Sequence, residues 1–124
     1  MKYLIERASA ITPKDSLDDL LKNKKSLRIK LGVDPTAPDV TLGWYAILRA
    51  LRKFQDYGHT AVLILGEFTA QVGDPSGKSE TRTQLEENQI DDNSKGVLPI
   101  IKDILNEENL EIVSNKDWLS KLST

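Results

Sequence analysis

The chain has 124 residues, 29% of them charged, and a net charge of −2. That length fits one compact domain, and the near-neutral charge gives no electrostatic basis for wrapping nucleic acid. The sequence contains no cysteine, which excludes disulfides, thiolate catalysis and cysteine-based zinc sites and fits a reducing cytoplasm. No apolar run approaches the ~20 residues that span a bilayer. We therefore expect a soluble cytoplasmic protein without a membrane segment.

The first third of the chain predicts a helix, a strand and a loop. Residues 15–24 have the spacing of a short amphipathic helix, and acidic residues near its start complement the helix dipole. Residues 27–32 alternate apolar and basic side chains, which is typical of a strand. Residues 34–39 contain Pro35 and Pro38, and two prolines so close together block regular pairing. We take residues 1–26 as a helical lead-in to a single domain that covers residues 1–124.

The middle of the chain predicts a helix followed by a buried strand. Residues 42–57 repeat apolar side chains every three or four positions, which builds one apolar helix face, and Gly58 is placed to end that helix. Residues 60–65 are an almost unbroken apolar run, which suits a strand buried on both faces of a parallel sheet. Residues 66–83 are rich in Gly, Pro, Ser and Thr and predict a long loop.

The last third completes an alternating pattern. Residues 84–105 predict a helical region that Gly96 and Pro99 should break or kink, because proline lacks an N–H group. Residues 110–114 predict a third strand, and residues 117–122 a short helix. Strands and helices in this order predict a βαβαβ unit, a Rossmann-like doubly wound parallel half-sheet of the α/β class.

One motif imitates a phosphate-binding P-loop. Residues 73–79 read GDPSGKS, but a P-loop needs four residues between its glycines and this segment has three. Pro75 also removes a backbone N–H that such a loop would use. We therefore expect no P-loop here.

Polar residues instead gather after the first two predicted strands. In an open α/β sheet, ligands bind outside the carboxyl ends of the strands, so the loops at 33–41 and 66–79 should face one site. Gly43 opens the following helix, where a missing side chain lets a ligand approach the backbone. From spacing alone an equal alternative holds: Asp39 is a helix cap, Gly43 a packing choice and Asp74 a turn former. The polar candidates in the two loops are Asp34, Thr36, Asp39, Glu67, Thr69, Gln71 and Asp74.

Two segments resemble the bacterial tyrosyl-tRNA synthetase family. Residues 30–39, KLGVDPTAPD, are similar to the family segment before its ATP-binding helix, and residues 66–82, GEFTAQVGDPSGKSETR, to the segment after the next strand. Residues 114–122, SNKDWLSKL, resemble a later family segment. The resemblance covers nearly the whole chain and matches the front half of the family's catalytic domain.

The resemblance implies a role for several of these positions. Asp34 and Asp74 would line the tyrosine pocket, where a carboxylate balances the substrate ammonium. Thr36 would face the ATP phosphates and Gly43 would lie under the adenosine. The implied reaction is attack of the tyrosine carboxylate on the ATP α-phosphate with release of pyrophosphate, with Mg²⁺-ATP as substrate, no tightly bound cofactor and no resident metal. The residues that would shape the floor of the tyrosine pocket are Gly66, Phe68 and Gln71.

The sequence departs from the family at its signature. Where the family has a His-x-Gly-His tetrad at the helix start, this chain has residues 41–44, TLGW. Thr41 keeps a hydrogen-bond donor but cannot carry charge, Leu42 and Gly43 fill the middle positions, and Trp44 puts a bulky indole where the second histidine would touch the nucleotide. The only histidine, His59, is expected at the surface at the far end of that helix, where it cannot substitute. We therefore assign no catalytic residue.

The resemblance also leaves the family's second half unmatched. No segment resembles its tyrosine-recognition helix, its KMSKS loop or its anticodon-binding domain. We expect no aminoacylation by these residues alone and no direct tRNA binding. We expect instead self-association or a protein partner at the surface that a second half would cover.

Three interpretations of function follow. The first is a diverged binding or interaction module without catalytic activity. The second is an active or partly active fragment of a tyrosine-tRNA ligase that binds ATP and tyrosine. The third is a stand-alone fold in which Trp44 packs into the core.

Overall fold

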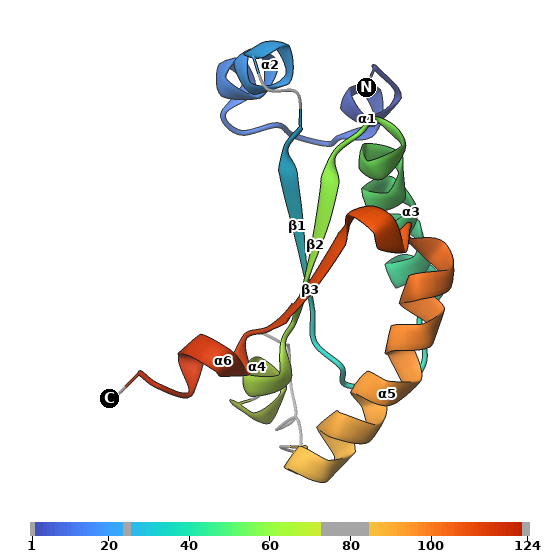
Figure 1. Ribbon diagram of the computed structural model, residues 1–124, viewed down its shortest axis with the longest axis vertical. Helices are drawn as coiled ribbons and strands as arrows, with labels where there is room; N and C mark the ends of the chain where they lie inside the picture. The colour runs from blue at the N-terminus through green and yellow to red at the C-terminus, as the bar shows by residue number, and fades with distance from the viewer. Residues whose placement is uncertain (1, 24–25, 73–84, 123–124) are drawn as a thin grey trace.

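The computed structural model describes residues 2–23, 26–72 and 85–122. Figure 1 shows one sheet flanked by helices, with short helices beyond both of its ends. None of the described helices combines the length and the apolar character needed to cross a bilayer. The strands are β1 (Arg28–Val33), β2 (Thr60–Leu65) and β3 (Leu110–Ser114); the helices are α1 (Lys2–Arg7), α2 (Lys14–Asn23), α3 (Leu42–Asp56), α4 (Glu67–Val72), α5 (Glu87–Ile104) and α6 (Lys116–Leu119), with a 3-10 turn, η1, at Glu107–Asn109.

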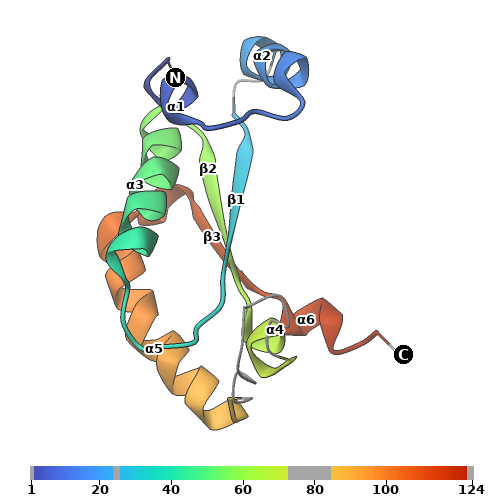
Figure 2. The same ribbon diagram turned by 180° about the vertical axis from the view of Figure 1, so that it is seen from behind.

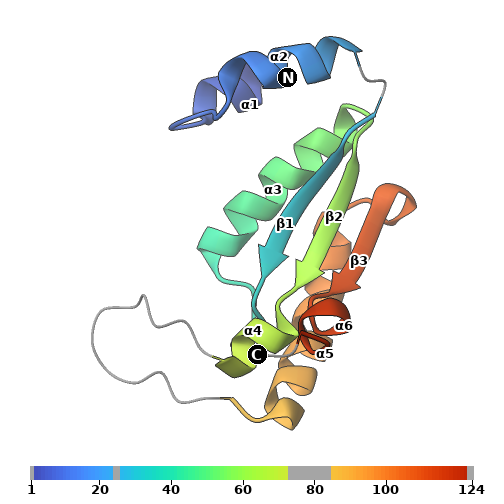
Figure 3. The same ribbon diagram turned by 90° about the vertical axis from the view of Figure 1, so that its left-hand side faces the viewer.

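The sheet has the predicted parallel architecture. Its strand order is β1-β2-β3, and both neighbouring pairs are parallel. Leu31 pairs with Leu63, which in turn pairs with Ile112. All three arrowheads in Figure 3 therefore end at the same edge, where the following loops and short helices gather. The predicted α/β class with a Rossmann-like half-sheet is confirmed.

A hydrophobic core fills the space between the sheet and helices α3 and α5, which cover the same face (Figures 1 and 2). The apolar stripe of α3 supplies Leu48 and Leu51, and β2 is buried along most of its length, as its apolar run predicts. Burial of each such side chain stabilises the fold by roughly 1.5–3 kcal/mol. The buried core residues are Val33, Leu48, Leu51, Ala61, Leu63, Leu65, Val97, Ile101 and Leu105.

The opposite face of the sheet, which we call the open face, carries no helix among the described residues (Figures 1 and 3). Along β1 the exposed residues alternate with half-buried ones, and a Cβ built on Gly32 would meet no atom within 4 Å. Arg28 on β1 forms an ion pair with Glu111 on β3 across this face. A parallel sheet is ordinarily covered on both faces, so the open face is an unusual feature of this fold.

Three boundaries differ from the sequence prediction. The predicted loop at 66–83 contains helix α4, and the rest of that loop, including Asp74 and the GDPSGKS motif, lies outside the described residues. Helix α5 runs without a break through Pro99, because Val97 and Ile101 on either side of the proline are both buried in the core. The last helix ends at Leu119, earlier than predicted.

Gly96 does not break the helix, and close packing accounts for the glycine at this position. A Cβ at this position would lie 2.7 Å from the carbonyl oxygen of Pro38 and 3.0 Å from the Pro38 Cβ. Helix α5 therefore approaches the 34–41 loop closely only because residue 96 has no side chain. This contact fixes the loop that follows β1.

Candidate functional site

The carboxyl ends of the three strands bring polar residues together, as the topology requires. Asp34 follows β1, Gly66 follows β2 and Asn115 follows β3. Backbone bonds hold these positions in place: the Gly66 N–H donates to the Val33 carbonyl at 2.8 Å, and the Asn115 N–H donates to the Leu65 carbonyl at 2.9 Å. The strand ends thus align three successive connections at one edge.

A chain of side-chain hydrogen bonds positions Asp34. Asn115 Nδ2 donates to Thr69 Oγ1 at 3.0 Å, and Thr69 Oγ1 donates to Asp34 Oδ1 at 2.8 Å. Asn115 Oδ1 also accepts from the Phe68 N–H at 2.9 Å, which ties the first turn of α4 to β3. Asn115 is buried, whereas the Asp34 side chain is exposed. The network therefore holds an accessible carboxylate in one orientation.

Gly66 makes this arrangement sterically feasible. A Cβ built on Gly66 would lie 1.7 Å from Asp34 Oδ1 and 2.6 Å from Thr69 Oγ1. Distances below 3.0 Å do not occur for real Cβ atoms, so any side chain at position 66 would displace the carboxylate. The glycine is required by the position of Asp34.

A second group ties α4 to its neighbours beside this edge. Glu67 Oε1 accepts from the Ser94 hydroxyl on α5 at 3.3 Å, and Glu67 Oε2 accepts from the Ser114 hydroxyl on β3. Lys116 and Glu87 form an ion pair between α6 and the start of α5, and the hydrogen bond from the ammonium lowers the pKa of the Glu87 carboxyl below its usual value. These contacts fix the position of α4.

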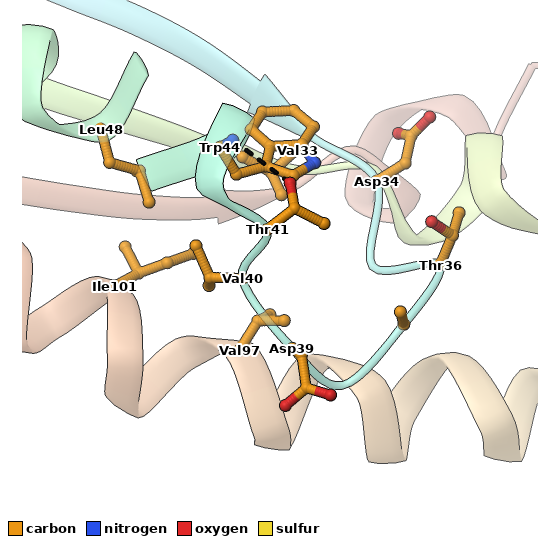
Figure 4. Close-up of a pocket in the computed structure, with 11 residues that line it drawn as sticks. Val33, Asp34, Thr36, Asp39, Val40, Thr41, Trp44, Leu48, Val97 and Ile101 are labelled. Atoms are coloured by element: carbon orange, nitrogen blue, oxygen red, sulfur yellow. Dashed lines mark hydrogen bonds between the residues drawn. The ribbon is translucent and has the colours of Figure 1, made fainter. Parts of the chain in front are cut away.

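The start of α3 borders a small cavity (Figure 4). Its volume is ≈ 60 Å³, far below the 300–1,000 Å³ typical of ligand pockets. Its polar side chains are two carboxylates, two hydroxyls and the Trp44 indole N–H, and the described residues that line it include no lysine, arginine or histidine. The lining residues are Val33, Asp34, Thr36, Ala37, Asp39, Val40, Thr41, Trp44, Leu48, Val97 and Ile101.

Trp44 forms part of the cavity wall. Its side chain is half-buried, packs against the hydrophobic core and lines the same cavity as Asp34 (Figure 4). The indole therefore faces the pocket, a point that the sequence left open. Because a bulky ring occupies this position, it reduces the space beside the helix start.

Thr41 is the N-cap of α3. Its Oγ1 accepts a hydrogen bond from the Trp44 N–H at 3.3 Å, and its backbone is extended, as N-caps are. The alternative interpretation of Asp39 as the cap is therefore wrong, and Asp39 lies on the cavity rim instead. This hydrogen bond holds the Thr41 hydroxyl over the first turn of the helix.

Gly43 has no packing reason to be glycine. A Cβ built there would meet only Thr41 Oγ1, at 3.9 Å, which is ordinary contact. The interpretation of Gly43 as a packing choice is therefore wrong. Leu42, beside it, is 83% exposed, so the first turn of α3 presents open backbone to solvent.

The remaining predicted residues lie apart from the cavity. Gly66, Phe68 and Gln71 lie at the same sheet edge but do not line the cavity. The structure thus unites Asp34, Thr36, Thr41 and Trp44 in one pocket.

His59 contradicts the surface prediction, because it is 5% exposed. Its Nδ1 accepts from the Leu27 N–H at 3.3 Å, and its ring lies 6.1 Å from that of Phe54, centroid to centroid. It sits before β2, at the opposite end of the sheet from Asp34, and therefore cannot act in the cavity. In the described part of the chain, no group of three or more His, Cys, Asp or Glu residues could hold a metal ion.

Comparisons with known proteins match this fold and these segments. The family described as tRNA synthetases class I (W and Y) matches residues 22–124. The chain is 48% identical over 117 residues to a tyrosine–tRNA ligase of Prochlorococcus marinus, covering 86% of this chain and 28% of that protein. It is 42% identical over 123 residues to a tyrosine–tRNA ligase of Thermotoga maritima, covering 99% and 31%. The chain thus spans less than a third of the length of these relatives.

Two solved structures share the fold. A tyrosyl-tRNA synthetase from Archaeoglobus fulgidus, complexed with L-tyrosine, aligns with a TM-score of 0.74 at 17% identity, over 95% of this chain and 34% of that one. A C-terminally truncated mitochondrial tyrosyl-tRNA synthetase from Coccidioides posadasii aligns with a TM-score of 0.71 at 24% identity, over 98% and 36%. At these identities the two structures support the fold alone.

Proposed function

Because this chain belongs to the class I tRNA synthetases of the tryptophan and tyrosine type, we propose that residues 1–124 form a binding module that does not itself make tyrosyl-adenylate. The observation that carries this proposal is the cavity at the start of α3. It is small, it is walled by Trp44, and the described residues that line it include two carboxylates but no cation.

Adenylate formation requires the opposite electrostatics. Attack of a carboxylate on the ATP α-phosphate builds negative charge that positioned donors or cations must stabilise. Asp34 and Asp39 on the cavity lining repel a triphosphate, and the Thr41 hydroxyl is oriented by its bond to the Trp44 N–H. Loss of one stabilising donor costs ~3–4 kcal/mol, on the order of a hundred- to a thousandfold in rate. Among the described residues, the lining of this cavity therefore offers no cation to stabilise the charge that builds up in this step.

The partner surface is the open face of the sheet. Val62, Ile64 and Val113 alternate with core-facing residues along β2 and β3 and so belong to this face. Ile64 and Val113 are half-buried, whereas Val62 is buried at 7% exposure. A parallel sheet ordinarily has both faces covered, so we infer that residues 1–124 bind further protein surface here, for example that of a second copy or of a protein partner. Sedimentation velocity at increasing protein concentration tests the proposal. We expect the sedimentation coefficient to depend on concentration, or the protein to form a complex with a partner. A protein that stays monomeric at all concentrations and binds no partner would contradict the proposal.

Tyrosine-dependent exchange of pyrophosphate into ATP tests the lack of catalysis. We expect no exchange above the blank with residues 1–124, in parallel with a complete tyrosine–tRNA ligase as positive control. Tyrosine-stimulated exchange by residues 1–124 would contradict the proposal.

Two observations favour a second candidate, an active or partly active fragment that binds ATP and tyrosine. Asp34 is an accessible carboxylate held by Thr69, as recognition of a substrate ammonium requires. Gly43 leaves the helix start open to a ligand. Calorimetric titration with ATP, tyrosine and a non-hydrolysable tyrosyl-adenylate analogue separates the two candidates, because a saturable heat favours the fragment and its absence removes it.

A further inference from the structure

A groove with an apolar floor and a cationic rim lies between α1 and α3, on the side of α3 away from the sheet. Its volume is ≈ 420 Å³, within the range of ligand pockets. We call its apolar lining residues, which include Ala46, Ala50 and Phe54, the floor, and its cationic lining residues, Arg7, Arg49 and Lys53, the rim. The groove shares no lining residue with the cavity beside Asp34.

The charge of this surface differs from that of the whole chain. The chain has a net charge of −2, whereas α3 carries Arg49, Arg52 and Lys53 against the single carboxylate of Asp56. Arg52 and Lys53 both pair with Asp56. Arg49 makes no hydrogen bond or ion pair within the part of the chain that the structure describes. A guanidinium in this setting is ready to bind a carboxylate through two parallel hydrogen bonds.

A second hollow continues the same surface. It has a volume of ≈ 300 Å³ and lies on the other side of Arg49 and Lys53; its lining also includes Tyr45, Arg52, Ile104 and the carboxylates of Asp56 and Asp103. Tyr45 is 43% exposed. Arg49 and Lys53 on α3 are therefore flanked by a hollow on each side. One hollow has the apolar floor, and the other contains Tyr45.

We propose that the α1–α3 groove is a docking site for an acidic amphipathic helix of a partner protein. Carboxylates on the flanks of such a helix complement the cationic rim, and its apolar side chains cover the alanine and phenylalanine floor. Between Ala46 and Phe54 the α3 axis rises ~12 Å, about two helical turns, so the partner presents apolar anchors at positions i, i+3 or i+4, and i+7. A nucleic-acid backbone satisfies the cations but leaves the apolar floor exposed, which favours the peptide.

Fluorescence anisotropy tests the docking site. The probe is a fluorescein-labelled peptide of leucine and glutamate, about 14 residues long and patterned for one apolar helix face. We expect saturable binding that weakens as salt is raised, because exposed charges are screened. A peptide of the same composition with scrambled order, and one with lysine in place of glutamate, should bind at least about tenfold more weakly.

Matched variants assign the binding to this groove. Lys53→Glu and Lys95→Glu are suited to comparison, because each lysine lies in an ion pair of 3.1 Å with an aspartate three positions away on its own helix, and Lys95 lies outside the groove. We expect Lys53→Glu and Arg49→Glu each to weaken binding about tenfold and Lys95→Glu to leave it unchanged. Ala46→Gln, at an exposed helix position, should weaken binding by placing a polar group on the floor. Circular dichroism checks that each variant is folded.

Three results would overturn the proposal. The first is an absence of peptide binding up to about 1 mM, where a specific docking site would already show saturation. The second is equal loss of binding in the Lys53 and Lys95 variants, which would indicate general charge attraction. The third is tighter binding of a single-stranded oligonucleotide with the same dependence on Arg49 and Lys53, which would make the groove a nucleic-acid site.

Discussion

Replacing Gly66 with alanine tests whether the close packing at the sheet edge holds Asp34 in place. The new Cβ would lie 1.7 Å from Asp34 Oδ1 and 2.6 Å from Thr69 Oγ1, so the carboxylate must rotate away and lose its 2.8 Å hydrogen bond to Thr69. Overpacking costs ~1–3 kcal/mol and a hydrogen bond ~1 kcal/mol. Replacing glycine lowers the conformational entropy of the unfolded chain, which stabilises the folded state by ~0.4–1 kcal/mol. We expect a net loss of about 2 kcal/mol.

The assay is urea unfolding followed by circular dichroism, together with thermal unfolding. With an unfolding entropy of ~2.1 cal/mol/K per residue over 124 residues, a loss of about 2 kcal/mol lowers Tm by about 8 °C. A double-mutant cycle with Asp34→Ala isolates the contact. Truncation of Asp34 removes the clashing oxygen, so Gly66→Ala should cost at least about 1 kcal/mol less in that background. Equal costs in both backgrounds, or a Gly66→Ala variant as stable as the parent, would refute the assignment.

Three further substitutions have expected signs. Gly43→Ala should raise the free energy of unfolding by about 0.5–1 kcal/mol, because the added Cβ meets only ordinary contact; a destabilised variant in urea unfolding would show that the backbone there needs glycine. Gly96→Ala should lower it by about 1–3 kcal/mol in the same assay, because the Cβ would meet backbone atoms of Pro38 at 2.7 Å; any gain in stability would contradict this packing. Trp44→Ala should cost about 2–3 kcal/mol, less than the ~3–5 kcal/mol of a fully buried aromatic, since the indole is half-buried; an unchanged Tm would show that the indole packs against nothing.

The sequence predicted the elements that periodicity defines. The apolar run of β2 and the apolar stripe of α3 each depend on residues close together in the chain, and the structure confirms both. Helix α4 was missed because its six residues are too few for a helical repeat to stand out from a Gly- and Ser-rich segment. The predicted break at Pro99 considers only the local effect of proline on the helix. The burial of Val97 and Ile101 against the sheet keeps the helix continuous.

The misassigned residues share a different cause. His59 was predicted at the surface because a lone histidine after a helix usually is, but its partner, the Leu27 N–H, lies 32 positions away in the sequence. Asn115 was not singled out, although it follows β3 at the same edge where Asp34 follows β1. The strand-end rule alone could have found Asn115, and no local signal could have found the burial of His59.

The residues at the sheet edge differ in what they indicate about function. The Asp34–Thr69–Asn115 network and Gly66 stabilise the fold through contacts within the chain, so their presence is explained without a ligand. Gly43 is different, because glycine inside a helix costs about 0.5–1 kcal/mol and no neighbour requires it. Glycine at this position therefore leaves the backbone accessible, and no packing contact offsets the stability that it costs. The position lies next to the cavity that Trp44 narrows. If a ligand uses this helix start, Gly43→Ala should stabilise the protein and abolish the heat of ligand titration together. If no ligand uses it, the substitution should stabilise the protein and leave the titrations unchanged.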